Sequence, residues 1–397
     1  MEYRTLGQTN IIVSKAGMGV LPIGPEQYKL SVEEGAKVIC HAIESGINFL
    51  DTAQYYKTYP YIKRALEMLN KCPGSKEQEF IPRTQLQKLE GGFLGQYKEN
   101  TAEDGAGNCG NRVFGQTLER LSGNCGNRVF EQPGVGKGSE KNNFPRGFCA
   151  EKIVICSKSL AKDYDGMKNA IDVACIEMGL EQIDIFLMHE VRSGQFSERS
   201  GAWRALLEAK KNGLVHAIGV STHHVDTVNE MADVSECDCI FALTNYAGMG
   251  IRKGDGPGTR EEMEAAIKAA SLKGKGIFSM KSFGGGNLTG NYVKALDYAF
   301  SVDGVDSVMI GFGSEREVDD LAAYLDGKLK EGFNPDVSEK KVQVNRADCE
   351  GCGECIKACA SDAISFADDG LAFIDQTKCI TCGYCAYACT TRAIIMI

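Results

Sequence analysis

The chain has 397 residues and a net charge of −9, with 43% hydrophobic and 24% charged residues, a balance typical of a globular protein. Its length predicts two or three domains. An acidic chain without a basic stripe lacks the clustered cations that nucleic-acid binding requires, and no apolar run approaches the roughly 18 residues of a membrane span. We therefore expect neither a nucleic-acid partner nor a membrane partner.

The most unusual feature of the composition is 17 cysteines. The first residues, MEYRTLGQTN, lack the basic and then apolar pattern of a secretion signal, so a disulfide framework is not expected. Metal binding or redox chemistry in a reducing cytoplasm explains the cysteines better.

The first predicted elements are a short hairpin, with YRTL and IIV on either side of a Gly-Gln-Thr-Asn turn. After it, short apolar strands alternate with amphipathic helices. Ser31 and Glu34 form a capping-box pattern ahead of the first helix. The predicted strands are 15–20, 47–53, 152–158, 183–189, 215–221, 239–245, 276–282 and 307–312. The predicted helices are 31–45, 61–69, 163–178, 202–211, 225–232, 261–271, 291–300 and 315–325.

Eight strands, most of them followed by a helix and apolar enough to be buried on both faces, predict a closed parallel (β/α)8 TIM barrel of class α/β. The barrel would span residues 1–327, with 72–150 inserted. The inserted stretch is rich in Gly and Asn and contains GNCGNRVF twice, at 107–114 and 123–130. We interpret it as a surface excursion. A metal site at Cys72, Cys109, Cys125 and Cys149 and a lid or docking role are alternatives.

Four ionisable residues lie at the ends of consecutive predicted strands or in the loop after one, at the end of the barrel where active sites form. These are Asp51, Tyr56, Lys158 and His189. Moving a hydride to a carbonyl leaves an alkoxide that needs a proton, and a phenol is a reluctant donor. Lys158 would lower the pKa of Tyr56, Asp51 would hold Lys158, and His189 would orient the carbonyl oxygen. Each residue alone could equally be structural.

The barrel sequence resembles the aldo/keto reductase family in GINFLDTAQYY, VICSK, DIFLMHE, IGVSTH, the strand ending TNY, and MKSFGGGNL. The resemblance implies Tyr56 as proton donor, with Asp51, Lys158 and His189 as partners. It also implies NAD(P)H across the barrel mouth, with Ser221 and Asn245 among the cofactor-binding residues.

Several cofactor positions depart from the family pattern. Met280 stands where the family stacks a tyrosine on the nicotinamide, Thr222 and Leu321 replace asparagines, and Phe241 replaces a glutamine. The loops 284–286 and 311–314, the latter with Gly311 and Ser314, could cradle phosphate or be plain turns. Arg316 could pair with a 2′-phosphate or be solvated, so NADH and NADPH both remain open. His223 and His224 could touch substrate, although exposure is the more common state of loop histidines.

The end of the chain repeats a cysteine pattern, C-x2-C-x2-C-x3-C, after 30 residues. The cysteines are Cys349, Cys352, Cys355 and Cys359, and then Cys379, Cys382, Cys385 and Cys389. The spacing is typical of [4Fe-4S] ligation. Zinc and a purely structural pair of clusters are alternatives.

Residues 345–397, after a linker at 328–344, resemble a small α+β two-cluster ferredoxin. That resemblance implies crossed ligation, with Cys389 joining the first three cysteines and Cys359 joining Cys379, Cys382 and Cys385. The usual proline after each fourth cysteine is Ala360 or Thr390. The whole chain resembles the aldo/keto reductases of anaerobes that carry such a C-terminal domain.

These observations predict an iron–sulfur oxidoreductase that uses NAD(P)H to reduce a small carbonyl, or runs in reverse, and that exchanges electrons with a ferredoxin or another redox protein. Hydride carriers deliver two electrons and clusters accept one, so a flavin could bridge them. The alternatives are therefore a flavin-containing electron-transfer reductase of an unsaturated substrate and a non-catalytic redox sensor or scaffold.

Overall fold

The computed structural model describes residues 1–70, 153–330, 332–335, 340–379 and 383–397. Residues Met1–Ser75 and Phe148–Ile397 form one compact unit. The predicted insertion, its repeated octapeptide and its cysteines lie outside the described residues, as does Cys382. The predicted limits of the barrel, linker and tail remain predictions.

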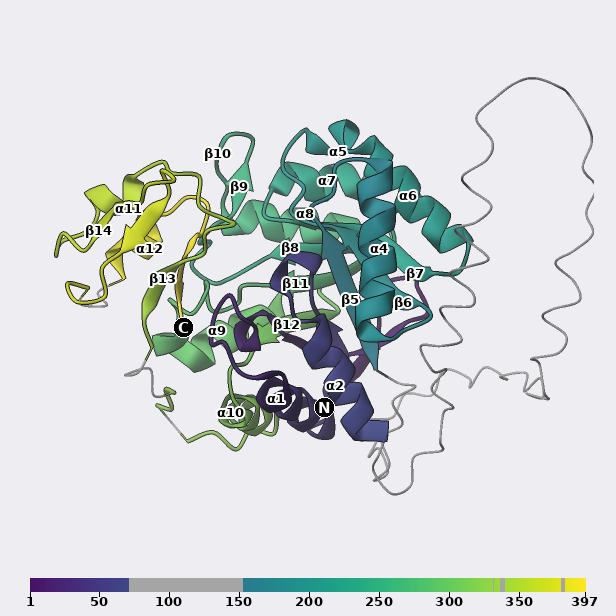
Figure 1. Cartoon of the computed structure of the whole chain (residues 1–397), viewed down its shortest axis with the longest axis horizontal. Helices are drawn as coiled ribbons and strands as arrows, with labels where there is room; N and C mark the ends of the chain where they lie inside the picture. Colours follow the sequence, from purple (N-terminus) through teal and green to yellow (C-terminus); the bar gives the residue numbers. More distant parts are fainter. Residues whose placement is uncertain (71–152, 331, 336–339, 380–382) are drawn as a thin grey trace, which may run out of the picture. The chain divides into compact units, whose positions relative to one another are not determined.

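The central element is a closed barrel of eight parallel strands, as the alternating pattern predicts (Figure 1). The strands in order around the barrel are β3 (Ala16–Gly19), β4 (Phe49–Asp51), β5 (Val154–Ser159), β6 (Ile183–Met188), β7 (Val215–Thr222), β8 (Cys239–Leu243), β11 (Gly276–Met280) and β12 (Ser307–Gly311). All eight predicted strands are confirmed. The antiparallel hairpin of β1 (Tyr3–Thr5) and β2 (Ile12–Ser14) is confirmed as well.

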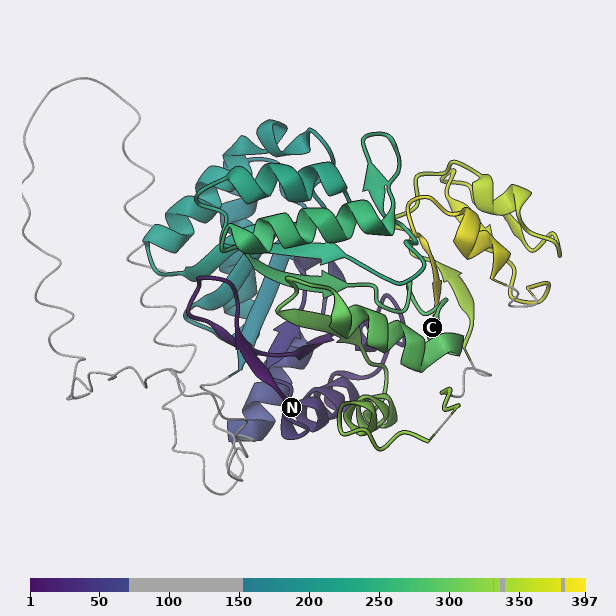
Figure 2. The ribbon, with the colours of Figure 1, turned by 180° about the vertical axis from the view of Figure 1, so that it is seen from behind.

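Helices cover the outside of the barrel in the views of Figures 1 and 2. They are α1 (Val32–Glu44), α2 (Tyr59–Asn70), α4 (Tyr164–Met178), α5 (Gln195–Glu198), α6 (Ser200–Lys211), α7 (Val225–Asp233), α8 (Arg260–Leu272), α9 (Tyr292–Ser301) and α10 (Glu315–Leu325). The capping box at the start of α1 forms as predicted, with Ser31 and Glu34 satisfying each other's backbone N–H groups. Short 3-10 turns lie at η1 (Leu21–Ile23), η2 (Gln54–Tyr56) and η4 (Thr289–Asn291).

Two hydrophobic layers hold this arrangement together. The larger layer lies between strands and helices, and the smaller one fills the barrel interior. Phe241 and Phe278 stack inside the barrel with ring centroids 4.4 Å apart, and Phe49 lies 5.1 Å from Phe278. Because this interior is packed, only the open end of the barrel remains for chemistry.

The C-terminal segment, yellow in Figure 1, is small and mixed in structure, as predicted. It contains β13 (Val342–Val344), α11 (Glu354–Lys357), β14 (Ile364–Phe366), β15 (Ala372–Ile374), α12 (Tyr384–Ala388) and β16 (Ile394–Met396). β13 pairs with β16 and β14 pairs with β15, both antiparallel. Two antiparallel strands of two residues each, β9 (Arg252–Lys253) and β10 (Gly256–Pro257), lie in the loop after β8.

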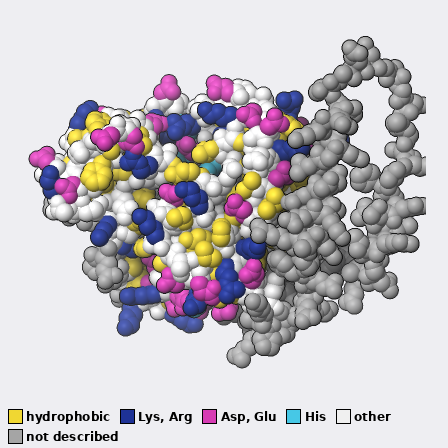
Figure 3. Space-filling view, viewed as in Figure 1, with side chains coloured by type: hydrophobic (Ala, Val, Ile, Leu, Met, Phe, Trp, Pro, Cys, Tyr) yellow, Lys and Arg dark blue, Asp and Glu magenta, His cyan; other side chains and the backbone are white. Residues whose placement is uncertain are grey.

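None of the described helices combines the length and apolar character needed to cross a membrane. On the face drawn in Figure 3, basic and acidic side chains are interspersed and form no single basic patch.

Candidate active site and cluster-binding segment

Asp51 and Lys158 form a buried ion pair at the ends of neighbouring strands. The Lys158 ammonium donates to both Asp51 carboxylate oxygens, at 2.6 and 2.8 Å, and to the carbonyl oxygen of Thr52 at 2.8 Å. Burial alone would lower the pKa of Lys158, but the Asp51 carboxylate raises it above its usual value. Lys158 is therefore a fixed cation at the mouth of the barrel.

Tyr56 lies in the 3-10 turn that follows β4, next to this cation. The Lys158 ammonium is 4.8 Å from the centroid of its ring, and the ring of His189 meets it edge-on with centroids 5.7 Å apart. Burial raises the pKa of Tyr56 to about 12, although Lys158 acts to lower it. Lys158 acts on this pKa in the expected direction, but the net shift is upward because loss of hydration outweighs the nearby charge.

His189 follows the last residue of β6, and its imidazole is neutral. Burial and the charge of Lys158 hold its pKa well below the usual range. Its Nδ1 is buried and has no hydrogen-bond partner among the described residues. The buried Arg199 holds the loop by donating to the carbonyl oxygens of His189, Ser159 and Ala161. The structure thus brings Asp51, Tyr56, Lys158 and His189 together.

A pocket opens beside these residues and is lined by Asp51 and Tyr56. Met280 and Gly311, two of the predicted cofactor residues, also line it, together with Lys281 and Ser282. The Ser282 hydroxyl is buried and unpartnered within the described part of the chain. Arg199, Lys281 and Ser282 were not predicted; the only signal for them was their position, at the end of a predicted strand for Lys281 and Ser282 and in the loop before a predicted helix for Arg199.

The other predicted cofactor residues are engaged elsewhere or exposed. The Ser221 hydroxyl accepts from the backbone N–H of Glu190 at 2.9 Å. Both ends of the Asn245 amide bond the backbone of Met249. Ser314 caps the start of α10, and Arg316 is exposed.

Both candidate phosphate loops make internal contacts. In the first, Gly285 accepts a hydrogen bond from the backbone N–H of Met396 at 2.7 Å, and a Cβ on Gly286 would lie 2.1 Å from the Met396 carbonyl oxygen. In the second, the backbone N–H of Gly313 donates to the Glu317 carboxylate at 2.7 Å, and Lys340 binds the same carboxylate at 2.8 Å. One backbone N–H of the second loop is therefore already hydrogen-bonded to a side-chain carboxylate.

His223 and His224 are both buried, so the expectation of exposed loop histidines is wrong. Burial holds the pKa of His223 well below its usual range and lowers that of His224 to about 4. His224 Nδ1 lies 3.1 Å from the Ser193 hydroxyl, and His223 Nδ1 lies 4.0 Å from the Glu190 carboxylate.

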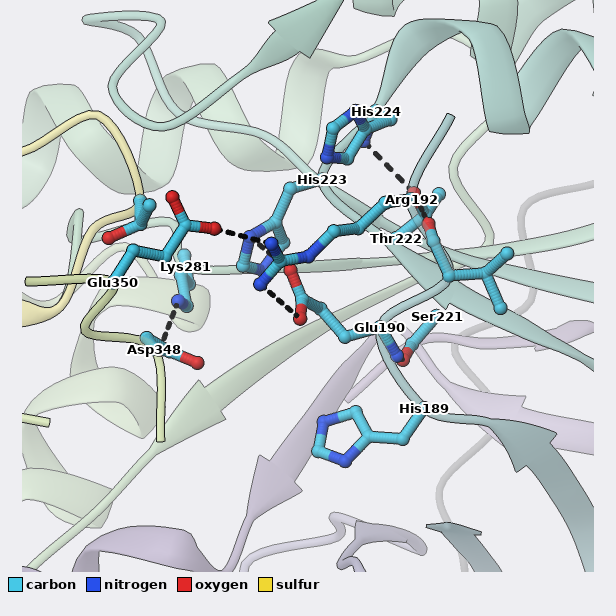
Figure 4. A network of polar contacts seen from close by, with 12 residues as sticks. His189, Glu190, Arg192, Ser221, Thr222, His223, His224, Lys281, Asp348 and Glu350 are labelled. Carbon is cyan, nitrogen blue, oxygen red and sulfur yellow. Dashed lines mark hydrogen bonds and ion pairs between the residues drawn. The ribbon is translucent and has the colours of Figure 1, made fainter. Parts of the chain in front are cut away.

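Ion pairs join the barrel mouth to the loop that carries Cys349 (Figure 4). Arg192 binds Glu350 and also lies 3.4 Å from Glu190. Lys281 binds Asp348 at 3.3 Å. The two acidic residues flank Cys349 directly. The sequence did not predict these ion pairs, because each of them joins residues far apart along the chain.

The cysteines gather in two groups. Cys349, Cys352 and Cys389 all act electrostatically on Cys355, whose pKa is raised to about 11, mainly by burial. Cys359, Cys379 and Cys385 line one small cavity together. In the described residues, no group of three or more potential ligands converges on a point suited to one metal ion. Thiolates around a four-iron cube need not converge in this way, because the cube is larger than an ion.

Comparison with known proteins finds a match for the barrel and another for the C-terminal segment. Residues 146–297 match the model of the Aldo/keto reductase family, and residues 341–390 match that of the 4Fe-4S dicluster domain. An uncharacterized oxidoreductase of Bacillus subtilis, YtbE, is 32% identical over 108 residues, which are 26% of this chain and 38% of that protein. Pyridoxal 4-dehydrogenase of Microbacterium luteolum is 19% identical over 256 residues, which are 62% of this chain and 63% of that protein.

The chain therefore spans between 38% and 63% of the length of these curated relatives. Among solved structures, the aldo-keto reductase AKR11C1 from Bacillus halodurans, in its holo form, matches with a TM-score of 0.52 at 13% identity. The match covers 85% of this chain and 93% of that one. At this identity the likeness shows the fold of the barrel.

Proposed function

We propose that this chain, which joins an aldo/keto reductase domain to a 4Fe-4S dicluster domain, is an oxidoreductase that interconverts a small carbonyl and its alcohol at the barrel mouth. The observation that carries the proposal is the assembly of Asp51, Lys158, Tyr56 and His189 beside one pocket. In this proposal NAD(P)H supplies the hydride.

In this proposal the protonation state of each residue determines its role in the reaction. Tyr56 donates the proton to the developing alkoxide, which is feasible because its hydroxyl stays protonated at physiological pH. The fixed charge of Lys158 stabilises that alkoxide and the tyrosinate left behind. His189, held neutral, hydrogen-bonds the carbonyl oxygen without giving up a proton.

For the cofactor, Met280 and Gly311 at the pocket wall are the proposed contacts, and Ser282 offers an unused hydroxyl. Ser221 retains its hydroxyl hydrogen for a carboxamide, since it accepts from Glu190. Asn245, Ser314 and Arg316 are proposed as supports of the same site. Because Glu317 holds the Gly313 N–H, NADH is favoured over NADPH.

The eight cysteines are the proposed ligands of two [4Fe-4S] clusters, which would supply one-electron transfer to a ferredoxin or similar redox protein. The first set is Cys349, Cys352, Cys355 and Cys389, three of which act electrostatically on the fourth, Cys355. The second is Cys379, Cys382, Cys385 and Cys359, three of which line one cavity.

A flavin reductase of an unsaturated substrate is the second candidate. One observation favours it: both loops expected to hold dinucleotide phosphates make contacts within the chain, with Met396 and with Glu317. A flavin would also bridge two-electron and one-electron carriers. Flavin released on denaturing the purified protein would establish this candidate.

The test of the first candidate is Tyr56→Phe, assayed anaerobically with small aldehydes and NADH or NADPH. We expect kcat to fall about 10²- to 10⁴-fold, as for loss of a general acid, with iron and sulfide content unchanged. Tyr55→Phe is the matched control, because the adjacent Tyr55 does not line the pocket. Equal activity of both variants with wild type would refute the proposed role of Tyr56.

A further inference from the structure

Arg392 is a buried arginine with few partners. Only 2% of its surface is exposed. One guanidinium nitrogen donates to the carbonyl oxygen of Ala386, whereas Nε and Nη2 are buried and find no partner among the described residues. Its aliphatic part packs tightly on Gly250, where an added Cβ would lie 1.9 Å from Arg392 Cγ. The side chain is therefore fixed in place.

A buried cation with two unmade hydrogen bonds is costly unless an anion compensates for it. Burial lowers the pKa of Arg392 to about 10, while the nearby Cys389 thiol group acts to raise it. An arginine guanidinium keeps its charge at neutral pH, and the Arg392 backbone N–H lies 3.4 Å from the carbonyl oxygen of the proposed cluster ligand Cys389. Nε and Nη2 of Arg392 are therefore buried donors without an acceptor in the described part of the chain.

The cysteine repeat allows a direct comparison of the two halves of the tail. Arg392 follows Cys389 by three residues, and Asp362 follows Cys359 by three. Both positions have left-handed backbone, with φ of 62° and 50°. The residues after them match as well, because Ala363 and Ile364 are buried like Ala393 and Ile394. One structural position therefore carries a buried cation in one half and an exposed anion in the other.

The proposed cluster next to this cation, although not the same half of the repeat, also involves the loop that meets the barrel. Cys349, a proposed ligand of the same cluster as Cys389, lies between Asp348 and Glu350, which bind Lys281 and Arg192 at the barrel mouth (Figure 4). The charge difference thus distinguishes the barrel-side cysteine set from the other one.

We propose that Arg392 raises the reduction potential of the cluster held by Cys349, Cys352, Cys355 and Cys389 above that of its twin, so that an electron shared between the two rests on the barrel side. A four-thiolate cluster is an anion that becomes more negative when it accepts an electron, so a buried cation stabilises the reduced form. Asp362 acts in the opposite sense on the second cluster, and more weakly because solvent screens it. This inference rests on the cluster ligation in the proposed function.

The test is an anaerobic redox titration of the full-length, cluster-loaded protein, following the electron paramagnetic resonance of the reduced clusters. Arg392→Gln removes the charge, Arg392→Lys keeps it, and Asp362→Asn neutralises the matching position in the other half. Iron and sulfide are measured first. A wild-type protein that binds fewer than two clusters contradicts the proposed function itself, separately from this inference.

In wild type we expect two reduction steps. In Arg392→Gln the step at higher potential should move down by about 59 mV, which is a tenfold change for a one-electron couple, and the other step should stay in place. Arg392→Lys should restore most of the shift, and Asp362→Asn should move only the lower step, upward and by less. Two loaded clusters with unchanged potentials in Arg392→Gln, or the same downward shift in Arg392→Lys, would overturn the inference.

Discussion

At Lys158 and Asp51 the interior of the protein holds a pair of opposite charges that are 1% and 6% exposed. Removing one partner of such a pair leaves the other charge buried and uncompensated, which typically costs 3–5 kcal/mol. The pair therefore matters for stability as well as for the charge that it places beside Tyr56.

We predict that Lys158→Met lowers the free energy of unfolding by about 3–5 kcal/mol. The single tryptophan, Trp203 of α6, is buried in the layer between strands and helices and reports unfolding by its fluorescence. Lys328→Met is the control, since Lys328 and its partner Asp326 are exposed and should contribute less than about 1 kcal/mol. A loss in Lys158→Met no larger than in the control would show that the buried pair is not a stabilising contact.

The raised pKa of Tyr56 predicts the pH dependence of carbonyl reduction. The active form of a proton donor is protonated, so activity is lost as pH rises through its pKa, about 12 for Tyr56. The active form of His189 is neutral, and its lowered pKa places any acid limb below its usual value near 6.5. We expect kcat/KM to be flat between about pH 7 and pH 10. A fall centred near pH 8 would contradict these assignments.

In the loop between β12 and α10, a backbone N–H that could bind phosphate is already hydrogen-bonded to a carboxylate. Glu317 accepts from the Gly313 N–H and pairs with Lys340, which also donates to the Tyr28 hydroxyl at 2.9 Å. An incoming phosphate at this loop would meet the negative charge of Glu317, so the loop disfavours a 2′-phosphate.

We predict that Glu317→Ala strengthens NADPH binding relative to NADH by about tenfold, because a hydrogen bond to a charged group contributes roughly 1.5–3 kcal/mol. The variant frees the Gly313 N–H and the Lys340 ammonium together. Dissociation constants for both nucleotides, measured by fluorescence titration, test this. The control is Glu315→Ala in the same helix turn, which should leave the ratio of the NADPH and NADH dissociation constants unchanged. If that ratio is also unchanged in Glu317→Ala, this loop does not determine which nucleotide binds.

The strands and helices were predictable because each carries its own local signal. A short apolar run marks each barrel strand, and Ser31 with Glu34 marks the start of α1. The four catalytic candidates were predictable for a related reason, since the C-terminal ends of parallel strands meet at one rim. The pKa of Tyr56 was not, because it depends on burial by residues distant in sequence.

At the scale of the whole molecule, β16 lies against the loop after β11. The Met396 N–H donates to the Gly285 carbonyl oxygen, and Leu288 and Met249 of the barrel pack with Ile394 and Ala386 of the tail. The sequence alone could not predict these contacts, because they join residues more than a hundred positions apart along the chain. Gly286 permits the approach, since its φ of +88° and its position beside Met396 leave no room for a side chain.

We predict that Gly286→Ala releases β16 from the barrel. An added Cβ would lie 2.1 Å from the Met396 carbonyl oxygen and would also strain the left-handed backbone. Hydrogen exchange of the peptide containing Met396 should become faster, with the cluster content retained. Gly290→Ala is a matched control in the same segment, with nothing within 4 Å of an added Cβ. Slow exchange in Gly286→Ala would show that this contact does not hold the tail.

We propose that the barrel site and the clusters belong to one redox enzyme, because ion pairs between Arg192 and Glu350 and between Lys281 and Asp348 join them. The most direct measurement is an anaerobic titration of the cluster-loaded protein with NADH and then NADPH, following the visible iron–sulfur absorbance after the flavin content has been assayed. We expect the nucleotide to bleach the clusters. Nucleotide binding and carbonyl turnover with clusters that stay oxidised would contradict the proposal.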